Sequence, residues 1–584
     1  MSSTSAAWSR RLLFPLSLVL AVSLASVGCG PSESAGAPDG TQRTPARIKT
    51  ITAAILNTPS GMSGVTAGAS SAGGWKGYNE VHSNGLFSTE PTSRKVTGLL
   101  AAEVPSLENG DLTLLPDGRM RVVYPLRQGV TWHDGVAFTA RDLAFTTRIL
   151  QDQGLPFNNG GAVAQQIASV ETPDDHTFVA TFNTPYFEAA SHALSSFWPL
   201  PEHILGPIYE EYLVTRDASD FANDEYWTSG YVHLGPFRLT NWEPASTITF
   251  QAYDGYYRGR PKVDILRVQV FQEVNALFAS LLAGTTDVLL DSVLNFERGT
   301  EIENRWHESG AGTVYIRPST LRILIPQFRP AVQIEPANLD PNVRTALSLA
   351  LDRGEMAAGL QAGHQETAAY GILLPNDPMY EAAKDTFRTH TYDPMRARTL
   401  LRDAGWALPT PDGVLQHASD GRRFRNVLSS TLDGTQQIAV IADYWRKVGL
   451  DVEEVVVPPA QSSNLEYRAS YAGWEITSNT YPTLKGPGAS AQTRWVGNRP
   501  GYDDPRLNAL INTFQSSISE REQFQTMIAI NDFIAANVLF LPLFGNSYHL
   551  GIRKGIRALD DREGGDGGMR LGSYSRNSHL WDVE

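Results

Sequence analysis

The sequence predicts an α/β fold, because helix-like and strand-like segments alternate along most of its 584 residues. Three helix-like segments begin with Asp-Pro ahead of a periodic apolar stripe. Asp accepts hydrogen bonds from the free N–H groups of a first helical turn, and Pro fits there because its missing N–H has no partner. Elsewhere a helix-like segment stops at a glycine and runs directly into a strand-like one, which is the pattern of an α/β protein.

The first elements lie in the N-terminal third. Residues 48–56 form a strand candidate, and residues 120–126 form a second one after the turn at Pro116-Asp117-Gly118. Thr139 can cap a helix that continues through Leu150, because an acidic residue stands three positions later, as a capping box requires.

The remaining elements lie in the C-terminal half. Helices are predicted to begin at Asp340-Pro341, Asp393-Pro394 and Asp504-Pro505, each with apolar residues on one face. Residues 438–448 form another helix, which ends at a glycine, and residues 450–457 form the strand that follows it.

Composition and charge limit the class of protein. Hydrophobic residues make up 42% and charged residues 19% of the chain, as in ordinary globular proteins. With 48 Lys and Arg against 62 Asp and Glu the net charge is −14, and removing the first 28 residues with Arg10 and Arg11 makes it −16. An acidic chain without a basic block is not expected to bind nucleic acid, since phosphate contacts need clustered Lys and Arg.

The N-terminus has the anatomy of a secretory signal peptide. Arg10 and Arg11 precede the apolar run 12–25, which is short for a membrane span. Cys29, the only cysteine, follows in a context that resembles a bacterial lipobox, although Ser26 stands where the pattern usually has Leu. We expect residues 1–28 to be removed, Cys29 to be lipidated, and residues 29–47 to form a flexible tether. A single cysteine also excludes disulfides within the chain and cysteine-based zinc or iron–sulfur sites.

Several segments resemble, in their order, the extracellular solute-binding proteins of family 5, the peptide-, nickel- and oligosaccharide-binding components of ABC importers. Residues 124–143, YPLRQGVTWHDGVAFTARDL, carry nearly every fixed position of the family's Leu-Arg-x-Gly-Val-x-Trp-x-Asp-Gly strand and turn and its Phe-Thr-Ala-x-Asp helix start. Four further segments match more weakly. They are the Gly-Pro-Phe strand with the YDGYYRGRP turn at 235–261, a Gly-x-x-Asp segment at 284–287, a Val-Arg-x-Ala helix at 343–353 and a Tyr-Asp-Pro helix at 392–405.

The resemblance implies a fold like that of type II periplasmic binding proteins, with three lobes and a hinge. Lobe I would take residues 48–92, 232–318 and 536–584, lobe II residues 93–231 and lobe III residues 319–535. A peptide or oligosaccharide-like solute would be enclosed between lobes I and III. The protein would be a monomer that delivers this solute to permease and ATPase subunits, outside the cytoplasm and held to the membrane by its lipid.

The segment that resembles the specificity region lacks a characteristic acid. Peptide-binding members have Gly-Trp-x-x-Asp-Tyr-x-Asp-Pro, whose first Asp pairs with the peptide's α-ammonium. Residues 473–482 read GWEITSNTYP, so the anchor position falls on Thr477 or Thr480. This favours a neutral polar ligand such as an oligosaccharide, while peptide binding through Glu475 or the main chain stays open. The ligand-binding candidates are Trp474, Glu475, Asn479 and Tyr481; the alternative role for Trp474 is core packing.

Other functions find less support in the sequence. There is no Gly-x-Ser-x-Gly elbow and no His-Glu-x-x-His motif, so no catalytic residue and no cofactor are predicted. The 12 histidines are scattered, so no metal ligands are predicted; His133 and His233 are expected on the surface or in the core. Two alternatives remain: capture of a metal chelate, as in nickel-binding relatives, and a solute sensor that presents its ligand to a receptor.

Overall fold

The computed structural model divides the chain into two compact units, residues 1–47 and 48–584. It describes residues 47–65, 75–89, 95–156, 161–190, 197–290, 293–294, 296–374, 377, 379–461, 464–478, 484–493, 495, 497–557, 568–569 and 575–584. The predicted signal peptide, Cys29 and all but the last residue of the predicted tether lie outside these residues. In the described part of the chain, no helix combines the length and the hydropathy that a membrane span needs.

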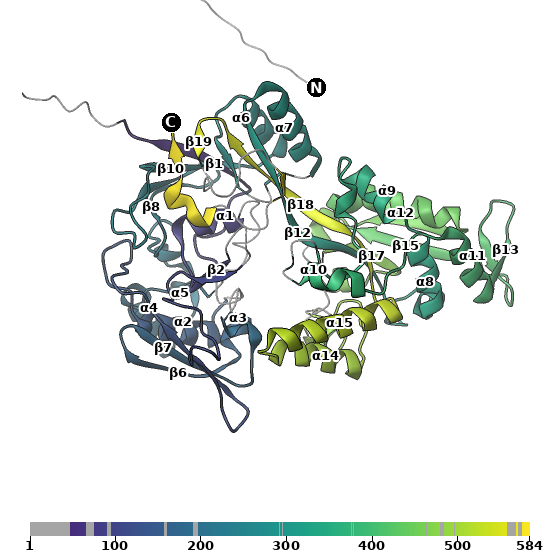
Figure 1. Ribbon diagram of the computed structural model, residues 1–584, viewed down its shortest axis with the longest axis horizontal. Helices are drawn as coiled ribbons and strands as arrows, with labels where there is room; N and C mark the ends of the chain where they lie inside the picture. Colours follow the sequence, from purple (N-terminus) through teal and green to yellow (C-terminus); the bar gives the residue numbers. More distant parts are fainter. Residues whose placement is uncertain are drawn as a thin grey trace, which may run out of the picture. The chain divides into compact units, whose positions relative to one another are not determined.

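The largest described sheet has 11 strands and lies at the centre of the second unit's fold (Figure 1). Its β1 strand pairs in parallel with both β10 and β11, and residues 51–55 are buried, as expected of a strand covered on both faces. The prediction of a strand at 48–56 is confirmed. β20 (Gly568–Met569) pairs with β12 beside the main path. The strands of that path are, in order, β16 (Asp451–Val456), β15 (Arg425–Ser430), β17 (Trp474–Thr477), β12 (Gly312–Pro326), β18 (Leu541–Arg553), β11 (Val288–Leu289), β1 (Thr50–Leu56), β10 (Ile265–Phe271), β9 (Thr247–Ala252) and β8 (Phe237–Glu243).

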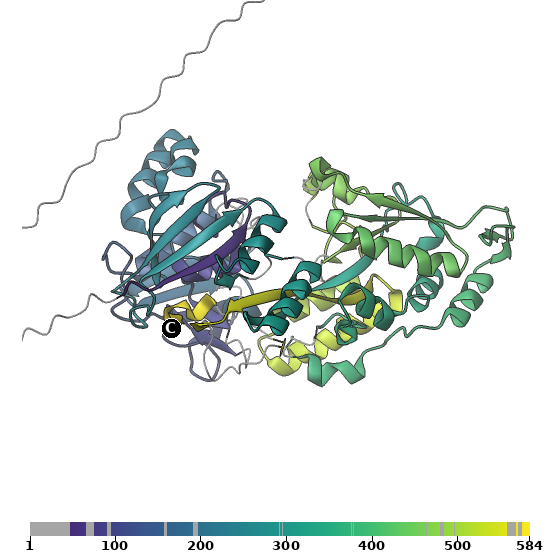
Figure 2. The ribbon, with the colours of Figure 1, turned by 90° about the horizontal axis from the view of Figure 1, so that it is seen from above.

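β12 and β18 join the two halves of this sheet. They form an antiparallel ladder from Gly312↔Arg553 to Leu324↔Leu541, with irregularities after Pro318 and after Arg322. One end of β18 pairs with β11, whereas the far end of β12 pairs with β17. Figure 2 shows this ladder from above, with β18 in yellow. The two strands therefore run continuously between the elements of predicted lobe I and those of predicted lobe III.

A second sheet lies within predicted lobe II. Its order is β4 (Leu112–Leu114), β5 (Met120–Pro125), β7 (Thr177–Phe182) and β6 (Ile167–Asp174). The helix α2 (Ala140–Gln151) packs against it and begins with the predicted capping box of Thr139 and Asp142. Trp132 and Phe138 from the family-like motif are 0% and 1% exposed, so they lie in the core.

The helices of the C-terminal half begin where the Asp-Pro pairs predict. Each Asp side chain accepts from a backbone N–H of the first turn, and each Pro takes the first helical position. These three helices are α8 (Pro341–Leu349), α11 (Pro394–Asp403) and α14 (Pro505–Ser516). The predicted helix at 438–448 is α12 (Thr435–Lys447), which Gly449 ends with a φ of +100° before β16 begins. Other described helices are α1 (Trp75–His82), α4 (Glu202–Thr215), α6 (Val274–Leu282), α7 (Phe296–Ser309), α9 (Arg353–Leu360), α13 (Leu465–Ala469) and α15 (Glu520–Asn537).

The buried hydrophobic residues form three clusters. The largest extends over elements of predicted lobes I and II, and the other two flank the β16-β15-β17-β12 part of the large sheet. Leu324 belongs to one of these two and Ile323 and Ile325 to the other, as the alternation of side chains along a strand requires. Val538, Leu541 and Phe544, which the prediction places in lobe I, pack with residues of lobe III. The three-lobed division itself stays a prediction.

Candidate ligand-binding site

The carboxyl ends of β15 and β17 form a topological switch point. The two strands are parallel neighbours, with Leu428 paired to Trp474. The chain leaves β15 into α12, which packs in one buried cluster, whereas the chain after β17 leads to α14, which packs in the other. The next long helices along the chain therefore pack on opposite faces of the sheet. Such a point leaves a crevice outside the strand ends, where open α/β sheets bind their ligands.

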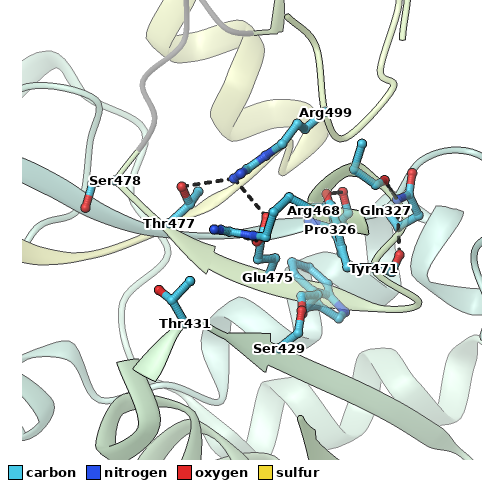
Figure 3. Close-up of polar contacts among 12 residues, drawn as sticks. Pro326, Gln327, Ser429, Thr431, Arg468, Tyr471, Glu475, Thr477, Ser478 and Arg499 are labelled. Carbon is cyan, nitrogen blue, oxygen red and sulfur yellow. Dashed lines mark hydrogen bonds and ion pairs between the residues drawn. The ribbon is translucent and has the colours of Figure 1, made fainter. Parts of the chain in front are cut away.

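Charged side chains gather at this strand end. We call them, with two neighbouring hydroxyl residues, the strand-end cluster, of which Figure 3 shows Arg468, Glu475, Thr477, Ser478 and Arg499. It consists of Arg322, Asp433, Arg468, Glu475, Thr477, Ser478 and Arg499.

Glu475 is the buried centre of the strand-end cluster. Its side chain is 1% exposed, and its Oε1 accepts from Arg468 at 2.5 and 2.9 Å. Its Oε2 lies 2.8 Å from Nη2 of Arg499. Burial raises the pKa of Glu475, and the guanidinium groups of Arg499 and Arg468 oppose that rise. With two arginines already paired to it, this carboxylate is not available as a lone partner for a ligand's cation.

Arg499 is held in place through its backbone and through β17. Its Nη2 also donates to Oγ1 of Thr477 at 3.1 Å. The neighbouring Asn498 is 1% exposed and donates to the carbonyls of Gly486 and Tyr502, which fixes the loop. Arg329 donates to the carbonyl of Arg499 at 3.1 Å. The guanidinium is therefore positioned by a rigid support, as a binding group should be.

Arg322 reaches the same strand end from the other face of the sheet. It is 5% exposed, and its Nε donates to Gln437 of α12 at 2.9 Å. Its Nη1 lies 3.3 Å from Oγ of Ser478 and 3.3 Å from Oδ2 of Asp433. Its Nη2 is buried and has no hydrogen-bond partner. Burial lowers the pKa of Arg322, and Asp433 opposes this effect.

A glycine permits this close packing. A Cβ on Gly434, at the start of α12, would meet Oγ of Ser430 at 1.8 Å and Nη2 of Arg322 at 3.0 Å. The first contact is far shorter than any real Cβ contact, so a larger residue here would force Ser430 to shift.

The four residues predicted to contact ligand are placed unequally. Trp474 is 0% exposed and packs edge-on against Trp445, with ring centroids 5.3 Å apart, in the core beneath α12. Glu475 lies in the strand-end cluster. Asn479 and Tyr481 lie outside the described residues. The structure thus brings Trp474 and Glu475 together on β17 but points them to opposite faces.

None of the three arginines of this cluster was predicted from the sequence as a site residue. Arg322 is a charge within the apolar run LRILI, and an isolated charge in a buried strand is a signal that could have identified it. Arg499 stands in a loop of Gly, Asn and Pro with no pattern that marks it. Its role depends on a contact with β17 across 22 positions of sequence.

Metal binding finds no support among the described residues, where no group of three His, Cys, Asp or Glu side chains is placed to hold an ion. His133 and His233 are 7% and 0% exposed, so they lie in the core rather than on the surface. Burial lowers the pKa of His133 to about 4. Both therefore serve packing as neutral side chains at neutral pH.

Comparison with known proteins identifies the family of the chain. Residues 111–497 match the family described as bacterial extracellular solute-binding proteins, family 5 Middle. The oligopeptide-binding protein AppA of Bacillus subtilis is 25% identical over 462 residues, which are 76% of this chain and 79% of AppA.

Two solved structures show the same fold. An oligopeptide-binding protein of Thermus thermophilus, complexed with a pentapeptide, matches with a TM-score of 0.69 and 19% identity, covering 91% of this chain and 96% of that one. NikZ of Campylobacter jejuni, in complex with Ni(L-His), matches with a TM-score of 0.69 and 17% identity, covering 91% and 99%. The chain therefore belongs to family 5 of the bacterial extracellular solute-binding proteins and acts as a solute-binding protein outside the cytoplasm.

Proposed function

We propose that the protein captures a peptide or oligosaccharide-like solute reversibly and delivers it to the permease and ATPase subunits of an ABC importer, without chemical change. The observation that carries this proposal is the strand-end cluster, a set of charged and hydroxyl groups, most of them buried or half-buried, at a switch point of the sheet. Family membership supports the transport role.

The solute would be enclosed between lobe I (48–92, 232–318 and 536–584) and lobe III (319–535). The β12–β18 ladder supports this arrangement, because two continuous strands linking the lobes let them rotate while their pairing stays intact. The protein would act as a monomer. Trp474, Glu475, Asn479 and Tyr481 remain the proposed ligand-binding residues, with Trp474 contributing from within the core.

Attachment through Cys29 is the second part of the proposal. The lone cysteine follows the apolar run 12–25 in a lipobox-like context. Acylation there would hold the folded body on a tether outside the membrane. Cys29→Ser should release the protein in soluble form, and continued retention in the membrane fraction would contradict lipidation.

Solute capture is tested on the full chain extracted in mild detergent. Mass spectrometry of the denatured protein should reveal any co-purified solute, and thermal shifts should follow with peptides, oligosaccharides and metal chelates. A ligand at 100 times its dissociation constant stabilises the folded state by about 2.7 kcal/mol. Conversion of any bound solute into a product would contradict capture without chemistry.

A further inference from the structure

We infer that the captured solute carries a negatively charged group, such as a carboxylate, and that Arg322 and Arg499 bind this group at the carboxyl ends of β15 and β17. The inference rests on the proposed capture function and adds the charge class of the solute. Peptide capture through an acidic anchor would require a positively charged group on the ligand, whereas this site would require a negatively charged one.

The first argument is unused hydrogen-bond donors. Nη2 of Arg322 and Nε of Arg499 are buried, and neither has an acceptor among the residues that the structure describes. An unpaired buried donor costs about 1–3 kcal/mol, and more when the group is charged. Arg499 contacts Thr477, the last residue of β17, and Arg322 contacts the next residue, Ser478, from the opposite face of the sheet. An anionic group outside this strand end would find donors on both sides.

The second argument is charge. The strand-end cluster has three arginines, Arg322, Arg468 and Arg499, and two acids, so it carries a net charge of +1. Glu475 is shared between two of the arginines, and Asp433 is 63% exposed. Water therefore screens the carboxylate that faces Arg322. A net positive charge in this buried setting, within a chain of net charge −14, favours an anion as its complement.

Two other buried arginines of the described chain, Arg344 and Arg353, lack this pattern, whereas Nε of Arg553, which pairs with Asp287, shows it too. Arg344 donates from all three nitrogens to main-chain carbonyls, and Arg353 donates to carbonyls and to Oγ of Ser348. Those two arginines are satisfied by the protein and serve its packing. Arg322 and Arg499, in contrast, each keep one buried nitrogen without an acceptor among the described residues.

The third argument concerns cations. Thr477, one of the two positions at which a peptide-type acid is expected, holds a hydroxyl that accepts from Arg499 at 3.1 Å. A ligand ammonium there would face a guanidinium, with the nearest carboxylate, Glu475, already paired twice. Like charges in such proximity are strongly unfavourable. The site therefore selects against a cationic end.

The test uses tripeptides that differ only in the charge of their ends. They are N-acetyl-trialanine, which is an anion, trialanine amide, which is a cation, and N-acetyl-trialanine amide, which is neutral. Trigalacturonate and maltotriose provide an anionic and a neutral sugar. Isothermal titration calorimetry of the full chain in mild detergent measures each affinity, and the net charge of any co-purified solute is determined by mass spectrometry.

Variants connect the preference to the named residues. Arg499→Gln should weaken binding of the anionic probe at least tenfold and leave the neutral probe unaffected. Arg425→Gln removes an exposed arginine from the other end of β15 and serves as the matched control, with less than a twofold effect. Thr477→Asp gives Arg499 a second internal carboxylate and should lower the affinity for the anionic probe, although both arginines are kept.

The outcomes separate this inference from the proposed function. Tighter binding of the anionic member of a pair, lost in Arg499→Gln and Thr477→Asp, supports the inference. Equal or tighter binding of a neutral or cationic probe, or a co-purified solute without a negative group, overturns it while solute capture stands. If no probe binds and no solute co-purifies, the proposed function fails as well.

Discussion

The two tryptophans that pack edge-on beneath α12 provide a sharp test of how this core is built. Trp474 and Trp445 are both 0% exposed and contact each other. They differ in one respect: Nε1 of Trp445 donates to the carbonyl of Leu347 at 3.1 Å, whereas Nε1 of Trp474 is buried without a partner. Replacing each with Phe therefore removes a similar area but a different polar interaction.

The magnitudes follow from that difference. Trp→Phe removes roughly 40 Å² of buried apolar surface, which is worth about 1 kcal/mol. In Trp474→Phe the unpaired N–H also disappears, and its desolvation penalty of about 1–3 kcal/mol disappears with it. The net change should be near zero. In Trp445→Phe the lost hydrogen bond adds a cost, so this variant should be about 2 kcal/mol less stable than Trp474→Phe.

Urea unfolding followed by far-UV circular dichroism measures both free energies of unfolding at unchanged slope. A Trp474→Phe variant that loses as much stability as Trp445→Phe would refute the reasoning. Solute affinity adds a second readout. If Trp474→Phe keeps its stability but loses affinity tenfold, Trp474 contacts the ligand as the sequence predicts; unchanged affinity assigns it to packing alone.

Three further outcomes are expected. Glu475→Gln leaves two arginines without their shared carboxylate and should lower the free energy of unfolding in urea by about 3 kcal/mol. The control Glu453→Gln breaks an exposed ion pair on β16 and should lower it by less than about 1 kcal/mol. Equal losses would contradict the ion-pair argument. The pKa of His133 is about 4 when folded against 6.5 as its ordinary value, so the unfolded chain binds more protons in between. Stability should then fall from pH 6.5 to 4, by about 3 kcal/mol from this residue, and a His133→Gln variant that shows the same loss would contradict the assignment. Gly434→Ala should lower stability by about 1–3 kcal/mol, because the new methyl group overpacks against Oγ of Ser430. The double variant Gly434→Ala/Ser430→Ala should recover part of this loss in thermal melts. If it recovers none, the strain lies elsewhere.

Local signals in the sequence predicted the elements well. The Asp-Pro helix starts, the Thr139 capping box and the glycine stop before β16 all depend on neighbours within a few residues, and each is confirmed. The family resemblance, drawn from ordered motifs, is confirmed by the match over residues 111–497. These features need no knowledge of tertiary structure.

The site was less predictable, because its contacts join distant parts of the chain. Glu475 was identified as the only acid of its segment, but its two arginines come from α13 and from a loop after β17. A sequence pattern cannot show that a carboxylate is already neutralised. The aromatic Trp474 likewise read equally well as a ligand contact or as core, and only its place on the inner face of β17 shows its packing.

The β12–β18 ladder has a consequence for how this chain is made. Its last rung, Leu324↔Leu541, closes a loop that contains every residue from 325 to 540. Adjacent strands lie about 4.8 Å apart, so this whole segment leaves and returns at nearly one point of the sheet. During synthesis β12 emerges long before β18, and its edge waits for a partner until the intervening segment is complete. The same geometry makes residues 325–540 a natural unit of exchange, since a relative's equivalent segment needs only two neighbouring strand ends to be grafted.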